Sequence, residues 1–242
     1  MNALALRDEI ICFCKANADE AIVKKYSIYF KEGHPGYDAY GVTTPLILGK
    51  VKELNNNNSV TLPVLLEAAP FLVKSGKQEE NLILLLLVEK RLKDLKSEDF
   101  ETISQWYAYG ILNWSLCDCL CNKITPWFFQ KNLIPLEKLA EWQISPYKFQ
   151  RRSVPVLLIK LLKTTNDYRP FFDLVAPLMM DTERAVHQGL GWFLREAWKK
   201  QPEQTEQFLL LWKDQSARLI FQYATEKMST EEKAKFRRHK NI

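Results

Sequence analysis

Hydrophobic residues recur every three or four positions along almost the whole chain, and polar residues fill the positions between them. This spacing is typical of amphipathic helices that bury one face. The periodic segments run for about ten to twenty residues, and short polar or proline-bearing connectors separate them. The connectors are KSGKQ (74–78), KSED (96–99), NKITP (122–126), ISP (144–146), TTNDYRP (164–170) and KKQPE (199–203). The pattern therefore predicts an all-α protein.

The predicted helices follow one another as pairs. The pairs are 60–73 with 78–92, 98–109 with 111–122, 126–142 with 147–163, and 168–180 with 183–200. Trp114, Arg151 and Trp192 lie on the second helices, at spacings of 37 (151 − 114) and 41 (192 − 151) residues. These spacings are near the period of HEAT and armadillo repeats, about 40–47 residues. We expect a superhelical solenoid of HEAT-like antiparallel helix pairs, in which equivalent helices line a concave basic groove.

No interior linker is long enough to divide the chain, so the sequence predicts a single domain over 1–242, with 233–242 as a frayed basic tail. Its 47% hydrophobic and 26% charged residues and only 8 glycines favour a packed helical core. Residues 1–122 hold 13 Lys and Arg against 16 Asp and Glu (−3), and 123–242 hold 21 against 13 (+8), which gives the net +5. A basic second half favours a polyanionic partner or serves solubility alone.

Several function classes lack their signatures in this sequence. The longest apolar run, Leu82 to Val88, is too short for a bilayer, and the N-terminus resembles no signal peptide, so we expect a cytoplasmic protein. Neither cysteine cluster has zinc or redox spacing and the three histidines are dispersed, so we expect reduced core thiols, no metal and no cofactor. The cysteines are Cys12, Cys14, Cys117, Cys119 and Cys121. P-loop, Rossmann and G-x-S-x-G motifs do not occur.

The segment GLGWFLREAWKK (189–200) sets a tryptophan among charges. Its predicted core face is formed by Leu190, Phe193, Leu194 and Ala197. Trp192 lies on the other side of the helix, on the same face as Arg195 and Glu196. We interpret Trp192 as displayed on a groove wall, with Arg195 and Glu196 as its polar support.

The segment LNWSLCDCLCNK (112–123) places Trp114 and Asp118 four residues apart on one helical face. The predicted buried stripe of the same helix is formed by Leu112, Leu116, Cys119 and Leu120. An indole beside a carboxylate could form a functional site. Alternatively, Trp114 covers a neighbouring repeat and Asp118 caps a nearby helix.

In KFQRRSVPVLLIKLLK (148–163), Arg151 and Arg152 fall in the first helical turn, where the helix dipole disfavours cations. A bound phosphate would supply the counter-charge. The alternatives are a solvated arginine pair or an ion pair with an acid such as Glu141. Pro155 predicts a kink or a late start of this helix.

In this order and spacing, GLGWFLREAWKK, the YGVTTP turn (40–45), W-x-x-x-D at Trp114 and Asp118, and FQRR (149–152) resemble the DNA alkylation repair protein family of AlkD type. The resemblance extends from about residue 20 to 228, and its most specific motif is G-W-x-L-R-E after the PLMMDTE connector. HPGY (34–37) looks like a small insertion relative to the family. The resemblance implies a HEAT-like DNA glycosylase.

The resemblance also implies roles for individual residues. Trp114 and Trp192 would contact the deoxyribose and backbone at the lesion, and Asp118 would be the carboxylate beside the glycosidic bond. Arg151, with Arg152 as the register alternative, would contact a phosphate. Tyr26 would be the N-terminal aromatic residue of the same site. Arg195, beside Trp192, is a further candidate DNA contact.

The chemistry is consistent with these residue types. A purine alkylated at N3 or N7 is cationic and its glycosidic bond is weakened. A carboxylate near C1′ would stabilise the oxocarbenium character that develops on the sugar. No lysine is identified as a nucleophile, so we expect a monofunctional glycosylase acting as a monomer on alkylated double-stranded DNA. A groove of Trp, Asp and Arg supplies no evident pocket for an extruded base, and the resemblance implies that bases stay stacked.

Two other interpretations remain open. The first is a non-catalytic HEAT-repeat protein that binds damaged or branched DNA, since the family includes relatives that bind DNA without base excision. The second is a protein-interaction scaffold, a common use of helical solenoids. The scaffold leaves the joint placement of Trp114, Asp118, Arg151 and Trp192 without an explanation.

Overall fold

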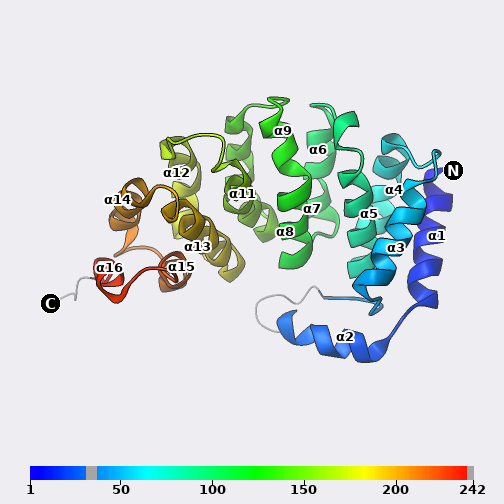
Figure 1. Ribbon diagram of the computed structural model, residues 1–242, viewed down its shortest axis with the longest axis horizontal. Helices are drawn as coiled ribbons and strands as arrows, with labels where there is room; N and C mark the ends of the chain where they lie inside the picture. The colour runs from blue at the N-terminus through cyan, green and yellow to red at the C-terminus, as the bar shows by residue number, and fades with distance from the viewer. Residues whose placement is uncertain (31–36, 239–242) are drawn as a thin grey trace. The chain divides into compact units, whose positions relative to one another are not determined.

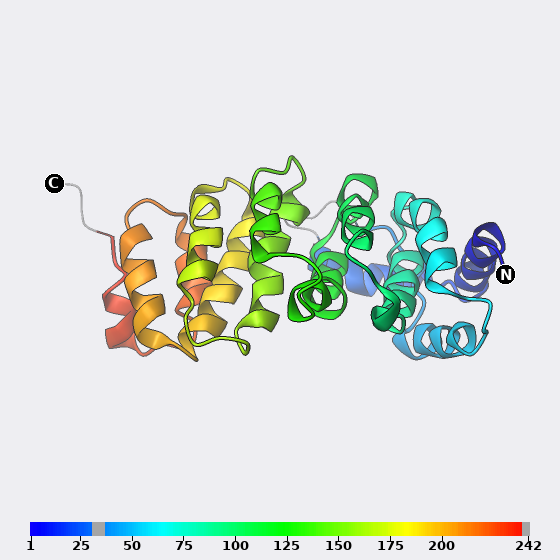
Figure 2. The same cartoon turned by 90° about the horizontal axis from the view of Figure 1, so that it is seen from above.

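The computed structural model describes residues 1–30 and 37–238, and these form helices throughout (Figures 1 and 2). The described ranges contain no β-strand, only an isolated bridge between Asp38 and Lys77. The predicted all-α class is therefore confirmed. The insertion expected at HPGY falls largely on 34–36, outside the described residues.

The chain forms two compact units, Met1–Leu133 and Ile134–Ile242. The elements of the first unit are α1 (Ala3–Ala16), α2 (Glu20–Ser27), η1 (Ile28–Phe30), α3 (Thr44–Asn55), α4 (Leu62–Lys74), α5 (Gln78–Glu89), η2 (Leu92–Asp94), α6 (Asp99–Ser104), α7 (Trp106–Tyr109), α8 (Trp114–Lys123) and α9 (Thr125–Gln130). Those of the second are η3 (Leu136–Leu139), α10 (Ala140–Gln143), α11 (Lys148–Leu161), α12 (Arg169–Val175), η4 (Ala176–Met180), α13 (Arg184–Trp198), α14 (Pro202–Trp212), α15 (Arg218–Ala224) and α16 (Thr230–Ala234). The single domain and the solenoid stay predictions.

Helix α5 is the centre of the first unit, where α1, α3, α4 and α8 pack against it. Its apolar run is buried on nearly all sides, from Ile83 through Val88. A helix that is hydrophobic all round belongs in a core. Within residues 1–30 and 37–238, no helix combines the length and the apolar character that crossing a membrane requires.

One predicted helix is interrupted, and one of the two alternatives raised by Pro155 does not apply. The helix expected over 126–142 is interrupted, because α9 ends at Gln130, Asn132 takes a left-handed φ of 53°, and Pro135 precedes η3. Asparagine tolerates this conformation, and proline lacks the backbone N–H that a regular helix uses. The late start suggested by Pro155 does not occur, since α11 begins at Lys148 and continues through this proline.

Helix α13 is the centre of the second unit, with α11 and α15 packed against it. The core face predicted for this helix is confirmed, as Leu190, Phe193, Leu194 and Ala197 are all fully buried. The two glycines of the G-L-G sequence, Gly189 and Gly191, permit α11 and α15 to approach α13 closely. A Cβ at Gly189 would lie 3.1 Å from Arg152 Cγ on α11. A Cβ at Gly191 would lie 2.4 Å from Tyr223 Cβ on α15.

We expect Gly191→Ala to destabilise the protein by about 2 kcal/mol, because the added methyl group would force α13 and α15 apart. Its Cβ would also meet the Ile220 backbone oxygen at 2.8 Å. Gly189→Ala should cost less, since its nearest neighbour is a flexible arginine side chain. Urea unfolding of both variants tests this ranking, and equal midpoints would contradict it.

The predicted frayed tail is partly wrong. Residues 233–238 pack against the second unit, with Phe236 buried and its ring 6.3 Å from that of Phe221. Arg218 donates a hydrogen bond to the Phe236 carbonyl, and Arg238 donates one to the Ser216 carbonyl. Phe236 supplies the apolar anchor that a purely basic tail would lack. Residues 239–242 lie outside the described range.

Candidate functional site

Trp114 and Asp118 lie one turn apart on α8, and both are partly exposed. Asn113 caps the helix by accepting a hydrogen bond from Leu116 N at 3.0 Å, and its amide donates to Gln78 Oε1 at 2.9 Å on α5. These bonds fix the first turn of α8, which carries Trp114. Asp118 follows on the same face, as the i, i+4 spacing predicts.

The buried stripe predicted for this segment needs correction. Leu112 precedes α8 and is 49% exposed, and Cys119 is only partly buried. The buried face of α8 is formed by Leu116, Cys117, Leu120 and Cys121. The difference follows from where the helix begins, because the helix starts at Trp114 and Leu112 therefore lies outside the helical repeat.

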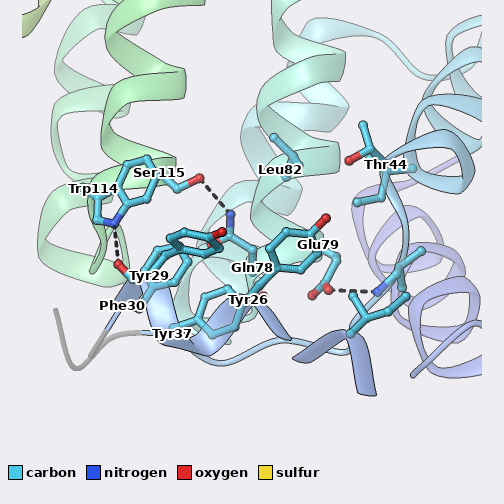
Figure 3. A pocket seen from close by; sticks show the side chains of 13 residues that line it. Tyr26, Tyr29, Phe30, Tyr37, Thr44, Gln78, Glu79, Leu82, Trp114 and Ser115 are labelled. Carbon is cyan, nitrogen blue, oxygen red and sulfur yellow. Dashed lines mark hydrogen bonds between the residues drawn. The ribbon is translucent and has the colours of Figure 1, made fainter. Parts of the chain in front are cut away.

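An aromatic cluster surrounds Trp114. The Phe30 ring stacks on Trp114 with centroids 5.2 Å apart and on Tyr37 with centroids 4.2 Å apart. The Trp114 indole donates a hydrogen bond to the Tyr29 carbonyl at 3.4 Å. Tyr26 and Tyr29 lie nearby, with ring centroids 6.5 Å apart. Figure 3 shows these rings gathered beside α8.

The cluster borders a cavity of about 470 Å³ within the first unit. Its lining residues are Ile22, Tyr26, Tyr29, Phe30, Tyr37, Val42, Thr44, Ile47, Gln78, Glu79, Leu82, Trp114 and Ser115. Two predicted site residues, Tyr26 and Trp114, are therefore brought together, while Asp118 is not among the lining residues. The expectation that a groove of Trp, Asp and Arg supplies no evident pocket for an extruded base stays a prediction, because neither Asp118 nor an arginine is among the described lining residues of this cavity.

Glu79 forms a polar wall of the cavity and is 3% exposed. Its carboxylate accepts hydrogen bonds from the backbone N–H groups of Tyr40 (2.9 Å), Gly41 (2.7 Å) and Val42 (3.1 Å). Three backbone donors on one carboxylate make strong, charge-assisted bonds. Glu79 therefore holds the YGVTTP turn against α5.

The other polar side chains that the described residues contribute to the cavity are neutral. Gln78 donates a hydrogen bond to Ser115 Oγ at 3.2 Å, which links α5 to α8 (Figure 3). Burial, together with the Glu79 carboxylate and Tyr26, raises the pKa of Tyr37 to about 12. The Tyr37 hydroxyl therefore remains protonated at neutral pH.

The other predicted site residues belong to the second unit. Arg151 pairs with Asp181, with Nε 2.6 Å from Oδ2, and its Nη1 donates to the Ser145 carbonyl at 2.7 Å. Both side chains are largely buried, with 16% and 7% exposed. The ion-pair alternative thus describes this arginine, but with Asp181 as the acid. Glu141 instead pairs with Lys138 at 2.6 Å.

Arg152 is 5% exposed, and its Nη1 donates to the Ala185 carbonyl on α13 at 2.6 Å. Its side chain also packs against the position of Gly189. Arg152 therefore joins α11 to α13. Arg151 and Arg152 were the two candidates for the phosphate contact, and of these Arg151 is the partly exposed one.

Trp192 is partly exposed on α13, and its neighbours on that face form ion pairs. Arg195 pairs with Glu226 of the segment after α15 and with Glu196 at 3.3 Å. Lys199 pairs with the same Glu196 at 3.0 Å. The polar support that Arg195 and Glu196 would give Trp192 stays a prediction, and the charge of Arg195 is already compensated by acids of the protein.

Core positions were expected for all five cysteines, but Cys12 is exposed and Cys119 is only partly buried. Cys14, Cys117 and Cys121 are buried, and burial raises the pKa of Cys119 to about 12. In the described ranges, no group of three or more His, Cys, Asp or Glu side chains is placed to bind a metal ion.

Sequence reasoning missed Tyr29, Phe30, Tyr37 and Glu79. Tyr26, Tyr29 and Phe30 are spaced i, i+3, i+4, a pattern that favours one helical face and could have signalled the cluster. Glu79 gave no local signal, because its partners are about forty residues away in the chain and meet it only in the folded unit.

Comparisons with known proteins identify the fold and the family of this chain. The solved structure of a predicted DNA alkylation repair enzyme from Enterococcus faecalis superposes with a TM-score of 0.72 and 14% identity, covering 88% of this chain and 98% of that one. No curated protein matches the sequence. The profile of the family described as DNA alkylation repair enzyme matches residues 14–228. The chain belongs to this family of DNA alkylation repair enzymes.

Proposed function

We propose that the protein is a monofunctional DNA glycosylase that hydrolyses the N-glycosidic bond of N3- or N7-alkylated purines in double-stranded DNA. The observation that carries this proposal is the placement of Trp114 and Asp118 one turn apart on α8, both partly exposed, in a chain of the alkylation repair family. We further propose that the helix pairs are HEAT-like repeats and that alkylated duplex DNA is the partner.

In this proposal Asp118 stabilises positive charge on the sugar. Loss of a cationic purine leaves oxocarbenium character at C1′, and a carboxylate nearby lowers the energy of that state and orients the attacking water. Trp114 excludes water from one side of Asp118. The face of its ring attracts the sugar as the sugar becomes positively charged. Trp192 is assigned the second indole contact with the DNA at the lesion. Tyr26 is assigned the neighbouring aromatic contact.

A duplex containing a single 7-methylguanine tests the reaction. The expected products are free 7-methylguanine and an abasic strand that breaks only after alkali treatment. An intact lesion strand after long incubation with the protein would contradict a glycosylase. A strand that breaks without alkali would contradict the monofunctional mechanism.

Asp181 provides a test of whether Arg151 contacts phosphate. We expect Asp181→Asn to lower the free energy of unfolding by about 1.5–3 kcal/mol, because Arg151 loses its charged partner. If Arg151 then contacts a phosphate, the slope of log affinity against log salt should become steeper by about 0.9. Anisotropy titrations at several salt concentrations measure this slope.

The matched control is Asp167→Asn, which removes an acid of the same unit from an exposed pair with Arg169. Both variants change the net charge equally, so only a contact specific to Arg151 makes their slopes differ. Equal slopes would assign Arg151 a structural role alone.

A further inference from the structure

The residue before Trp114 and the residue after it are both hydrogen-bonded to one side chain, that of Gln78. Asn113 Nδ2 donates to Gln78 Oε1 at 2.9 Å. Gln78 Nε2 in turn donates to Ser115 Oγ at 3.2 Å (Figure 3). Gln78 is the first residue of α5, whereas Trp114 is the first residue of α8. A single side chain of the central helix therefore spans the point at which α8 begins and from which the Trp114 indole projects.

The direction of these hydrogen bonds is set by the backbone of α8. Leu116 N is one of the N–H groups that the first turn of a helix leaves without a helical partner, and it donates to Asn113 Oδ1 at 3.0 Å. Because the Asn113 oxygen faces this N–H, its NH₂ group faces Gln78, and the Gln78 oxygen accepts. The Gln78 NH₂ group is then free to donate to Ser115. A glutamine side chain supplies both the acceptor and the donor, whereas an aliphatic side chain of similar size supplies neither.

The first turn of α8 is the part of this helix that most needs an external support. Helix ends fray, because the N–H groups of the first turn lack partners within the helix. Trp114 occupies the first position of α8, and Leu112 just before the helix is 49% exposed. Asp118 lies one turn further into the helix. Loss of the bonds to Gln78 should therefore move Trp114 relative to Asp118.

Gln78 is itself anchored in the first unit. Its backbone N–H donates to the Asp38 carbonyl at 2.7 Å. The next residue, Glu79, is buried and accepts the three backbone hydrogen bonds of the 40–42 turn. The start of α5 is thus held on both sides. A side chain carried by a rigid helix positions its partners more precisely than one carried by a loop.

We propose that Gln78 is a positioning residue of the reaction, which holds the Trp114 indole in place beside Asp118. It acts through Asn113 and Ser115, and it needs no contact with the base or the sugar. The inference rests on the proposed glycosylase function and deepens it. A displaced indole would shield the Asp118 carboxylate less well and would contact the sugar less closely. Misplacement by about 1 Å can cost about 100-fold in rate, so even a small displacement should be measurable.

Gln78→Leu tests the proposal in the full chain, because leucine makes neither hydrogen bond. We expect the single-turnover rate of 7-methylguanine release at saturating protein to fall about tenfold, while affinity for the same duplex changes less than about twofold. The Trp114 indole N–H donates to the Tyr29 carbonyl, so its resonance reports the position of the ring. This resonance, assigned by its loss in Trp114→Phe, should shift in Gln78→Leu without DNA.

Gln204→Leu is the matched control. Gln204 is also a half-buried glutamine in the first turn of a helix, α14 of the second unit. It also makes two hydrogen bonds, since Oε1 accepts from Tyr168 N and Nε2 donates to the Asn166 carbonyl, each at 2.9 Å. Its replacement should leave the release rate and the Trp114 resonance unchanged. Circular dichroism checks that each variant is folded.

Ser115→Ala provides a second variant, which keeps the test decisive if Gln78→Leu does not fold. It removes one of the two hydrogen bonds and should slow release about threefold, with a smaller shift of the Trp114 resonance. Added to Gln78→Leu, it should slow release no further, because the bond is already absent. Effects that multiply in the double variant would show that the two residues act separately.

The outcomes separate the positioning role from the glycosylase. An unchanged Trp114 resonance or an unchanged release rate in Gln78→Leu would overturn the positioning role, even if the wild type releases 7-methylguanine. Equal effects of Gln204→Leu would overturn it as well. If the wild type releases no 7-methylguanine, the glycosylase is rejected, and the shift of the resonance alone supports or overturns the placement of Trp114 by Gln78.

Discussion

Asp118→Asn is expected to slow the release of 7-methylguanine from methylated duplex DNA by about 100- to 1,000-fold, the effect of removing one electrostatic contact to a transition state. Asparagine keeps the shape of the side chain but lacks the negative charge that stabilises the oxocarbenium-like sugar. DNA affinity should change little, because the developing charge is absent from the ground state. Single-turnover release and anisotropy measure the two quantities separately.

Asp8→Asn is the matched control for this prediction. Asp8 lies on α1 of the same unit with 60% of its side chain exposed and pairs with Arg7, so its loss changes the net charge equally. Release by this variant should match the wild type. Equal rates for wild type and Asp118→Asn would leave Asp118 as a structural residue.

Gly41→Ala is expected to lower the free energy of unfolding by about 3 kcal/mol or more. Gly41 has a φ of 86°, which costs an L-residue about 1–2 kcal/mol. Its Cβ would also lie 2.0 Å from the Asp19 backbone oxygen, a clash that forces the backbone to move. The turn would then separate from α2 and from Glu79. The melting temperature should fall by about 6–12 °C.

Gly49→Ala is the control, because Gly49 lies within α3 and its Cβ would meet no atom within 4 Å in the described part of the chain. Alanine favours the helix, so this variant should be more stable by about 0.5–1 kcal/mol. The two substitutions add the same methyl group and are expected to change stability in opposite directions. A Gly41→Ala variant as stable as the wild type would contradict the observed turn.

The sequence was sufficient to predict the buried face of a helix where hydrophobic periodicity alone determines it. The buried face of α13 was predicted residue by residue, because helical spacing alone determines which side chains share a face. The break after Gln130 was not predicted, since it depends on the left-handed conformation of Asn132 rather than on hydrophobic spacing. The role of the two glycines in the G-L-G sequence could be recognised only from the positions of the neighbouring helices.

Charge partners were the least predictable part of the candidate site. The pairing of Arg151 with Asp181 joins residues 30 positions apart, and the burial of Arg152 depends on how α13 crosses α11. Both are tertiary effects that the local pattern does not encode. The sequence identified Trp114 and Asp118 as neighbours, but the cavity beside Trp114 needs α2, η1, α3, α5 and α8 in place.

Release of 7-methylguanine from a methylated duplex by the wild-type protein tests the central claim most directly, when affinity for the same duplex is measured in parallel. The account predicts free 7-methylguanine well above the spontaneous rate, with the DNA strand intact until alkali is added. DNA binding with no release above the spontaneous rate would contradict it and would favour a protein that recognises DNA without catalysis.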